Sequence, residues 1–349
     1  MNATRRGRRR SPDIGIALLV YVVSALAPAS VQAQTADRVI VISIDGLRSD
    51  AIDAAPALAL QALIAGGSYD PRCLNELPPS TLPNHASMVT GLSVTEHGIL
   101  ANGVLDGFIA ETTIFDIAAG QGRRVAFLVS KTKLGFLCRP EAADVRVIDG
   151  DIERIATSLL ENFANDPPNL TFVHFREPDG GGHRDGWMSA PYLAAVRQVD
   201  ALIGSFLSEL AALGLREGTV LVITADHGGF GNTHAWSIPA VRFVPLILNG
   251  PGFRAGHRIC AQTRNRDVGP IAAAIIGLQG PAEWLNRVPA DALLDGAPED
   301  AACTPAPLPM LGLPCMVLPL SVALASAIGW RRRLRPCPAG SPRAPDRLG

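Results

Sequence analysis

Short apolar runs rich in β-branched residues recur along the chain and alternate with longer stretches in which apolar residues have helical spacing. The short runs predict buried parallel strands at residues 38–44, 125–129, 170–175, 219–224 and 243–248. The longer stretches predict helices at residues 54–65, 152–165, 192–213 and 268–278. Because strands and helices alternate, we expect an α/β fold of three layers, with a largely parallel central sheet and helices on both faces.

The two ends of the chain depart from this alternation. Five arginines within residues 5–10 precede an apolar run from Ile14 to Ala27, and Val31-Gln32-Ala33 has the small residues of a signal-peptide cleavage site. Residues 308–330 are uncharged and are followed at once by an arginine cluster. That pattern predicts a C-terminal transmembrane helix, or a sorting tail that is later removed.

These features predict the organisation of the whole chain. We expect a signal peptide at 1–33, a catalytic domain at 34–295, an Ala/Pro-rich linker at 296–307, the transmembrane helix or sorting tail at 308–330, and a basic tail at 331–349. The protein would then be exported to the periplasm or the cell surface and anchored to the membrane by its C-terminal segment.

Charge narrows the classes of function. The net charge of the chain is −1, but both ends are basic, so the body between them is acidic. An acidic body argues against binding to a nucleic-acid polymer and suits a protein that holds cations. The body of an exported protein can form disulfides. Its four cysteines, Cys73, Cys138, Cys260 and Cys303, allow three pairings, and the sequence does not choose among them.

Three of the predicted strands are followed by an acidic residue: Asp45, Asp179 and Asp226. In open α/β sheets, ligands bind beyond the carboxyl ends of the strands. The three carboxylates can therefore converge on one crevice.

Three histidines accompany these carboxylates. His183 follows Asp179 in D-G-G-G-H, where the glycines would let a loop wrap around a small ion, and His227 and His234 lie in D-H-G-G-F-G-N-T-H. Mixed carboxylate and imidazole ligands suit zinc, with manganese as a harder alternative. Six side chains suit two ions, which could clamp the attacking and leaving oxygens of a phosphoryl transfer.

The segment S-T-L-P-N-H supplies candidate nucleophiles in Ser80 and Thr81. Pro83 suits the first turn of a helix, and the N–H groups at a helix N-terminus favour phosphate. Asn84 could donate its amide hydrogens to a phosphoryl oxygen. The alternative interpretation is that Ser80 or Thr81 only caps the helix.

Taken in order, D-G-L-R at Asp45, T-L-P-N-H at Thr81, P-D-G-G-G-H at Asp179 and D-H-G at Asp226 resemble the alkaline phosphatase superfamily. Within it, the chain is most similar to the nucleotide pyrophosphatase/phosphodiesterase, or type I phosphodiesterase, branch. The resemblance covers roughly residues 39–278 and implies an alkaline phosphatase-like fold with two zinc ions.

Carried over position by position, the resemblance makes Thr81 the nucleophile and Asn84 the phosphate-binding amide. The residues that it implies for the first zinc are Asp45, Thr81, Asp226 and His227. Those that it implies for the second are Asp179, His183 and a last histidine, for which we prefer His234 over His257.

The resemblance implies a metal-dependent hydrolase. We expect it to cleave phosphodiester or pyrophosphate bonds in a small-molecule phosphate ester through a phospho-threonine intermediate. Nucleotide-binding members often carry aromatic residues where this chain has Leu82 and His174, which leaves nucleotide specificity open.

Other activities fit the same residues. A phosphatase or a phosphonoacetate-type hydrolase would need an additional cation, and Arg176, Arg184 and Lys131 are available without any sign of which lies in the pocket. A membrane-tethered phosphotransferase would use the same nucleophile, and a non-catalytic binding module is a further alternative.

Overall fold

The computed structural model describes residues 36–103, 105–285 and 287–294. The predicted signal peptide, linker, C-terminal apolar segment and basic tail lie outside these residues. Within the described part of the chain, no helix combines the length and the hydropathy needed to cross a bilayer.

One sheet organises the described residues, with the strand order β4-β3-β5-β1-β6-β7-β2-β8. The strands are β1 (Arg38–Ile44), β2 (Ser68–Leu74), β3 (Val125–Val129), β4 (Val145–Ile148), β5 (Leu170–Phe175), β6 (Thr219–Thr224), β7 (Phe243–Asn249) and β8 (His257–Arg258). The five strands from β4 to β6 are mutually parallel, and β7 runs antiparallel to both β6 and β2. The expectation of a largely parallel sheet is confirmed.

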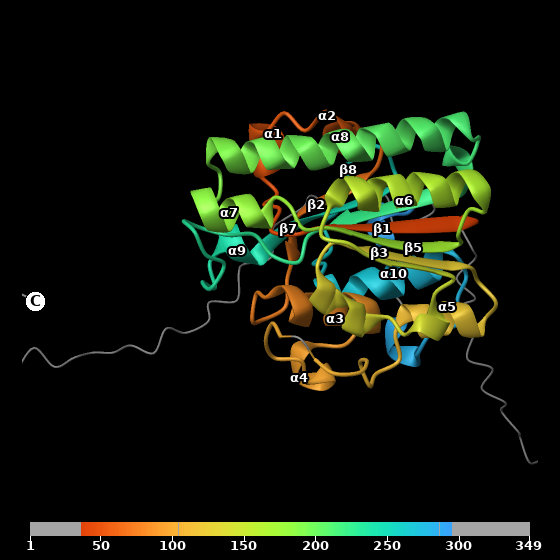
Figure 1. Cartoon of the computed structure of the whole chain (residues 1–349). Coiled ribbons are helices and arrows are strands. Elements are labelled where there is room, and N and C mark those ends of the chain that lie inside the picture. Colours follow the sequence, from red (N-terminus) through yellow and green to blue (C-terminus); the bar gives the residue numbers. More distant parts are fainter. Residues whose placement is uncertain (1–35, 104, 286, 295–349) are drawn as a thin grey trace, which may run out of the picture. The chain divides into compact units, whose positions relative to one another are not determined.

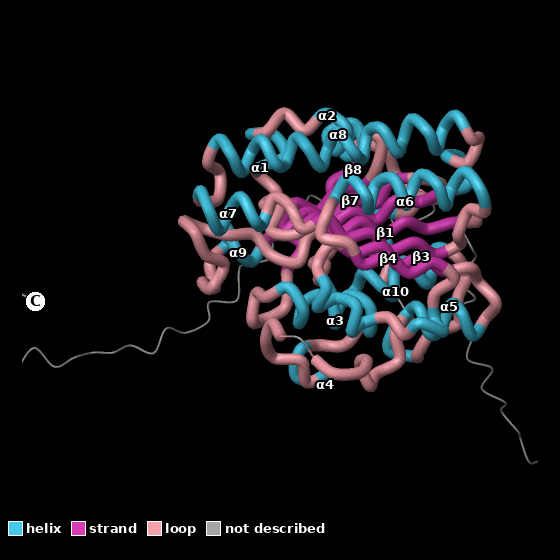
Figure 2. The backbone as a smooth tube through the Cα atoms, viewed as in Figure 1, coloured by secondary structure: helices cyan, strands magenta, loops and turns pink. Residues whose placement is uncertain are grey.

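Helices cover both faces of this sheet (Figure 1; Figure 2). One layer holds α1 (Ala51–Ala54), α2 (Leu58–Ala65), α6 (Ile152–Asn165) and α8 (Ala190–Ala212), with α7 (Asp179–Asp185) at its end. The other holds α3 (Thr81–Thr90), α4 (Val94–His97), α5 (Ile114–Gly120) and α10 (Val268–Ile275). A short α9 (Pro239–Arg242) leads into β7. The predicted three-layer α/β fold is confirmed.

The strand cores explain why the apolar runs predicted them so well. In β1, every residue after Arg38 is buried, and all six residues of β6 are buried. A parallel strand with helices on both faces excludes water from both of its sides, so its sequence is almost continuously apolar. The helices α6 and α8 meet through an edge-on contact between Phe163 and Phe206, whose ring centres are 5.1 Å apart.

The structure differs from the predicted elements where proline intervenes. A single helix was expected over residues 54–65, but α1 ends at Ala54 and α2 begins at Leu58, because Pro56 has no N–H to continue the helical hydrogen bonds. The strand β2 was not predicted, since its sequence S-Y-D-P-R-C-L mixes polar residues with Pro71. It pairs with β7 across an irregularity between Asp70 and Cys73.

Candidate active site

Four neighbouring parallel strands end at the edge of the sheet that carries the candidate residues. Lys131 follows β3, Asp179 follows β5, Asp45 follows β1 and Asp226 follows β6, and these strands are adjacent in the order β3-β5-β1-β6. Because the carboxyl ends of parallel strands lie at one edge, the sheet brings these charges together. We call Asp45, Asp179, His183, Asp226, His227 and His234 the strand-end cluster.

The ammonium of Lys131 links two carboxylates of this cluster. Its Nζ lies 2.7 Å from Asp45 Oδ2 and 2.7 Å from Asp179 Oδ2. Burial raises the pKa of Asp45, but Lys131 and a hydrogen bond from His174 together hold that pKa well below its usual range. Burial alone would lower the pKa of Lys131, and the two carboxylates instead raise it above its usual value. The lysine is therefore a fixed positive charge inside the cluster.

The three histidines of the strand-end cluster are oriented by the backbone. Each places Nδ1 against a carbonyl oxygen: His183 at 3.0 Å from Asn232, His227 at 3.0 Å from Gly228, and His234 at 2.6 Å from Pro79. Since Nδ1–H donates to these carbonyls, Nε2 keeps its lone pair, which is the arrangement found in metal-ligating histidines. Burial, with His227 beside it, lowers the pKa of His234 to about 4, so this ring is neutral around neutral pH.

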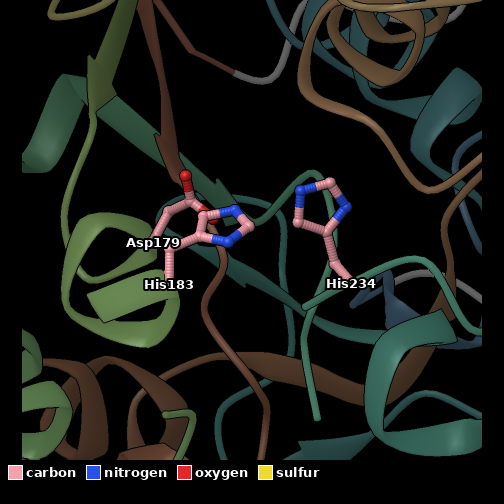
Figure 3. Close-up of side chains that lie close together, drawn as sticks. All are labelled: Asp179, His183 and His234. Carbon is pink, nitrogen blue, oxygen red and sulfur yellow. The ribbon is translucent and has the colours of Figure 1, made fainter. Parts of the chain in front are cut away.

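Asp179, His183 and His234 form the first of two groups that could hold an ion (Figure 3). One ligand atom from each lies within 4.8 Å of the other two. The side chains of Asp179 and His183 come from α7 and lie beside His234, which belongs to the loop after β6. The structure therefore brings the three residues expected for the second zinc to one place.

Asp45, Asp179 and His227 form the second group, again with ligand atoms within 4.8 Å of one another. His227 Nε2 also lies 3.3 Å from Asp226 Oδ2 and 3.7 Å from Asp45 Oδ1. The structure therefore brings the side chains of Asp45, Asp226 and His227, three of the four residues expected for the first zinc, close together.

Four buried atoms of the strand-end cluster have no hydrogen-bond partner among the described residues: Asp45 Oδ1, Asp179 Oδ1, Asp226 Oδ2 and His227 Nε2. Buried polar atoms are nearly always paired, because leaving them unpaired costs free energy. All four are lone-pair donors, so a cation would satisfy them together. The residues present fit zinc, which accepts carboxylate oxygen and imidazole nitrogen.

The segment D-G-G-G-H is a helix rather than the expected ion-wrapping loop. It forms α7, in which Asp179 and His183 are four residues apart and share one face. A Cβ at Gly182 would lie 2.6 Å from the ring of Trp187. The glycine is required by that close packing, and the helix turns both ligands toward the same side.

The ring of Trp187 packs against His183 and His234. The sequence did not identify this residue as part of the site. The indole is buried, its Nε1 donates to Gly46 O at 2.9 Å, and its ring centre lies 5.1 Å from that of His183 and 6.2 Å from that of His234. A bulky aromatic residue between two glycine-rich motifs was the only signal of it in the sequence.

Thr81 is the first residue of α3, and Ser80 is its N-cap in an extended conformation. The Ser80 side chain makes no capping hydrogen bond, and the Thr81 hydroxyl has none with another described residue. The first turn of α3 lies beside the end of β6, since His85 Nδ1 lies 2.7 Å from Thr81 O and 3.8 Å from Asp226 Oδ2. The threonine is therefore held next to the strand-end cluster.

Asn84 lies beneath this turn rather than at its surface. Its side chain is fully buried, and its amide nitrogen donates to the carbonyl oxygens of Glu76, Pro78 and Ser80 at 3.1–3.3 Å. Both amide hydrogens are thus engaged with the backbone. In this arrangement Asn84 stabilises the turn before Thr81 instead of facing the crevice.

A different amide, that of Asn102, stands beside the nucleophile position and was missed by sequence reasoning. Its Oδ1 accepts a hydrogen bond from Leu82 N at 2.9 Å, and the residue is exposed. No described residue accepts a hydrogen bond from its amide nitrogen. A donor next to Thr81 is therefore free to meet a ligand.

Leu82 and His174, the positions expected to carry stacking aromatics in relatives, are both fully buried. His174 places Nε2 2.9 Å from Asp45 Oδ2 and Nδ1 3.2 Å from Ser130 Oγ. His174 therefore orients the Asp45 carboxylate and has no exposed surface on which a substrate could stack. The signal in the sequence was a lone histidine within the apolar run L-T-F-V-H-F.

The structure also places the alternatives that the sequence left open. His257 lies on β8 and pairs with Asp291 at 3.4 Å, at the far edge of the sheet. Arg176 is exposed, and Arg184 pairs with Asp185 on the surface of α7. Of the three candidate cations, only Lys131 contacts the carboxylates of the strand-end cluster.

The layered fold and the strand-end cluster beside a helix-borne threonine define a member of the alkaline phosphatase superfamily. The family model for type I phosphodiesterase / nucleotide pyrophosphatase matches residues 39–234, which extends from β1 to the last histidine of the cluster. The chain belongs to that family.

Named relatives agree with this placement. The chain is 28% identical over 219 residues to bis(5'-adenosyl)-triphosphatase enpp4 of Mus musculus, an alignment that covers 56% of this chain and 47% of the relative. It is 28% identical over 216 residues to ectonucleotide pyrophosphatase/phosphodiesterase family member 1 of Mus musculus, covering 54% and 24%. The chain thus spans at most about half the length of these relatives.

Solved structures share the fold at low sequence identity. Murine ENPP5, as an inactive threonine-to-alanine variant in complex with AMP, matches with a TM-score of 0.62 and 16% identity, over 70% of this chain and 96% of that one. A 2-O GAG sulfatase matches with a TM-score of 0.58 and 14% identity, over 72% of each chain.

Proposed function

We propose that this protein is an exported, zinc-dependent phosphohydrolase. It cleaves phosphodiester or pyrophosphate bonds in a small-molecule phosphate ester through a phospho-threonine intermediate on Thr81. The observation that carries the proposal is the set of four unpaired, buried ligand atoms on Asp45, Asp179, Asp226 and His227, beside a threonine at a helix N-terminus.

The proposed ligands fall into two sets that share the crevice. Asp45, Thr81, Asp226 and His227 would hold one zinc ion, and Asp179, His183 and His234 the other, with Mn²⁺ as an alternative to Zn²⁺. Ions bound there would stabilise negative charge on phosphoryl oxygens and lower the pKa of the threonine hydroxyl.

The residues of the chain supply position and hydrogen bonds. The Oγ1 atom of Thr81 forms a bond to phosphorus as the bond to the leaving oxygen breaks, and water later displaces the threonine. N–H groups at the start of α3 stabilise a phosphoryl oxygen. We assign the amide role expected of Asn84 to Asn102, because the amide hydrogens of Asn84 are engaged with backbone carbonyls.

The names of the relatives support this chemistry. The name of the mouse triphosphatase specifies a phosphoanhydride substrate, and the structure of murine ENPP5 with AMP carries an inactivating threonine-to-alanine change. Both fit a threonine-dependent enzyme that attacks phosphorus.

Export is part of the same proposal. Cys260 is disulfide-bonded whereas Cys73 and Cys138 are free thiols, and a disulfide persists in an oxidising compartment. We further propose that residues 308–330 attach the protein to a membrane. Fractionation of cells that express the full chain, with and without these residues, tests the attachment.

The test of the activity compares three aryl substrates of the zinc-loaded protein: a phosphate diester, a phosphate monoester and a sulfate. Thr81→Ala is expected to lower diester turnover by roughly three orders of magnitude or more. The matched control is Thr90→Ala at the other end of α3, which should leave turnover largely intact. Equal turnover by Thr81→Ala and the wild type would overturn the proposal.

A further inference from the structure

Lys131 is the cation inside the strand-end cluster, and the proposed chemistry above does not use it. Its Nζ contacts Asp45 Oδ2 and Asp179 Oδ2, one carboxylate from each proposed metal set. The side chain is largely buried, with 15% of its surface exposed. The lysine therefore lies between the two proposed metal sets.

The position of Lys131 is fixed by the fold. Lys131 follows β3, which lies next to β5. The preceding residue, Ser130, donates a hydrogen bond from its Oγ to the backbone of β5, at His174 O, over 2.8 Å. The long side chain therefore starts from the neighbouring strand and reaches across the end of β5 to Asp45. A long cationic side chain at this position spans both carboxylates.

A charge count shows what this lysine adds. The strand-end cluster holds three carboxylates, of Asp45, Asp179 and Asp226, and two zinc ions would leave it with a net charge of +1. Lys131 raises this to +2. A phosphodiester brings a single negative charge. The site with Lys131 would therefore keep one positive charge that such a substrate does not neutralise.

The lysine also has hydrogen-bond donors to offer. An ammonium has three N–H donors, and Lys131 Nζ has two acceptors among the described residues, Asp45 Oδ2 and Asp179 Oδ2. The unpaired oxygens that would bind ions are Asp45 Oδ1 and Asp179 Oδ1, so Lys131 can keep both ion pairs while its third N–H stays without an acceptor among the described residues. An anionic substrate oxygen is the partner that suits this third N–H.

We propose that Lys131 is a specificity-determining residue that selects substrates carrying a second negative charge at or next to the reacting phosphorus. This inference rests on the proposed function and names the substrate class of the same site. The second charge can lie on the reacting phosphoryl group itself, as in a monoester, or on an adjacent phosphoryl group, as in a pyrophosphate.

The test replaces Lys131 by methionine, which keeps the length of the side chain and removes its charge. The control is Arg154→Met, because Arg154 is an exposed cation on α6 whose ion-pair partners, Asp149 and Asp151, lie outside the strand-end cluster. Both variants are made in the full chain, loaded with zinc, and checked for their zinc content.

Binding is measured first by calorimetry, with each substitution placed in the Thr81→Ala background. The probes are dimethyl phosphate with one charge, inorganic phosphate as a dianion, and inorganic pyrophosphate. Lys131→Met is expected to weaken phosphate or pyrophosphate binding by roughly ten- to a hundredfold, the loss of one charge-assisted hydrogen bond, and to leave dimethyl phosphate binding unchanged. The larger of the two losses identifies where the second charge lies.

Turnover gives the second readout, in proteins with Thr81 intact. The ratio of kcat/KM for an aryl monoester to that for an aryl diester should fall in Lys131→Met and stay constant in Arg154→Met. An unchanged ratio together with unchanged binding of all three probes would overturn the role of Lys131. Turnover that is insensitive to Thr81→Ala would instead contradict the proposed function, so the two failures are distinguishable.

Discussion

The indole of Trp187 lies so close to the Cα of Gly229 that a Cβ at this glycine would stand 2.1 Å from the ring. The ring is pinned by its hydrogen bond to Gly46 O and cannot retreat without losing that bond. Gly229 is thus required for packing, in the same loop that carries Asp226, His227 and His234.

We therefore expect Gly229→Ala to displace Trp187, and with it His183 and His234, which pack against the ring. The free energy of unfolding should fall by roughly 1–3 kcal/mol, as for other overpacked sites, and zinc affinity should fall as well. Denaturant unfolding and zinc titration measure the two effects. Gly120→Ala is the control, because a Cβ at Gly120 meets nothing within 4 Å. Similar behaviour of the two variants would show that the packing against Trp187 is unimportant.

His174 orients Asp45 from a position that no solvent reaches. Replacing it with leucine removes the hydrogen bond to Asp45 Oδ2, and zinc affinity should drop by roughly ten- to a hundredfold, as is typical when a residue that orients a metal ligand is lost. The control is His97→Leu, since His97 is also buried and bonded to a serine but lies on α4. Competition with a chromogenic chelator gives the affinities, and equal affinities in both variants would contradict the orienting role.

His85 predicts how the stability of the metal-free protein depends on pH. Burial lowers its pKa to about 4, from 6.5 in an unfolded chain. As the pH falls below 6.5, the unfolded state binds the proton first, so the free energy of unfolding decreases by roughly 3 kcal/mol on the way to pH 4. Above pH 6.5 both states are neutral and the contribution is constant.

The measurement is urea unfolding in the presence of a chelator between pH 7 and pH 4, where His85→Gln should show a shallower loss of stability than the wild type. Parallel curves for the two proteins would refute the assignment.

Removal of metal should destabilise the folded protein. The four unpaired ligand atoms are a cost that bound ions would relieve, and ligands present at about a hundred times their Kd stabilise by about 3 kcal/mol. We expect zinc to raise Tm by several degrees and a chelator to reverse the change. Asp179→Asn should abolish most of the shift, because Asp179 belongs to both candidate ligand groups. A Tm that does not change when zinc is added would contradict the proposed metal site.

The sequence predicted the central strands with accuracy because each is buried on both faces. The bounds of β1, β3, β5 and β6 agree with those expected from their apolar runs. The sequence did not predict β2 and β4, which lie toward the edges of the sheet. One side of a strand is less buried there, and polar residues are tolerated.

For the site, the sequence pattern could identify candidate ligands but not the residues that position them. Asp45, Asp179 and Asp226 could be found because each lies within a few residues of the end of a predicted strand. Trp187 and Asn102 could not, since their roles depend on which loops meet in space. Asn84 is the reverse case. It lies in a motif that suggested a phosphate-binding amide, but its amide hydrogens bond to backbone carbonyls.

The interleaved strand order has a consequence for how the protein is made. The strand β6 takes its place beside β1, although β2, β3, β4 and β5 all come between them along the chain. A growing chain that has produced Asp45 and Asp179 still lacks Asp226, His227 and His234. The proposed ions can therefore be captured in full only after the last of these has emerged, so acquisition of metal would be a late step of folding and not an early one.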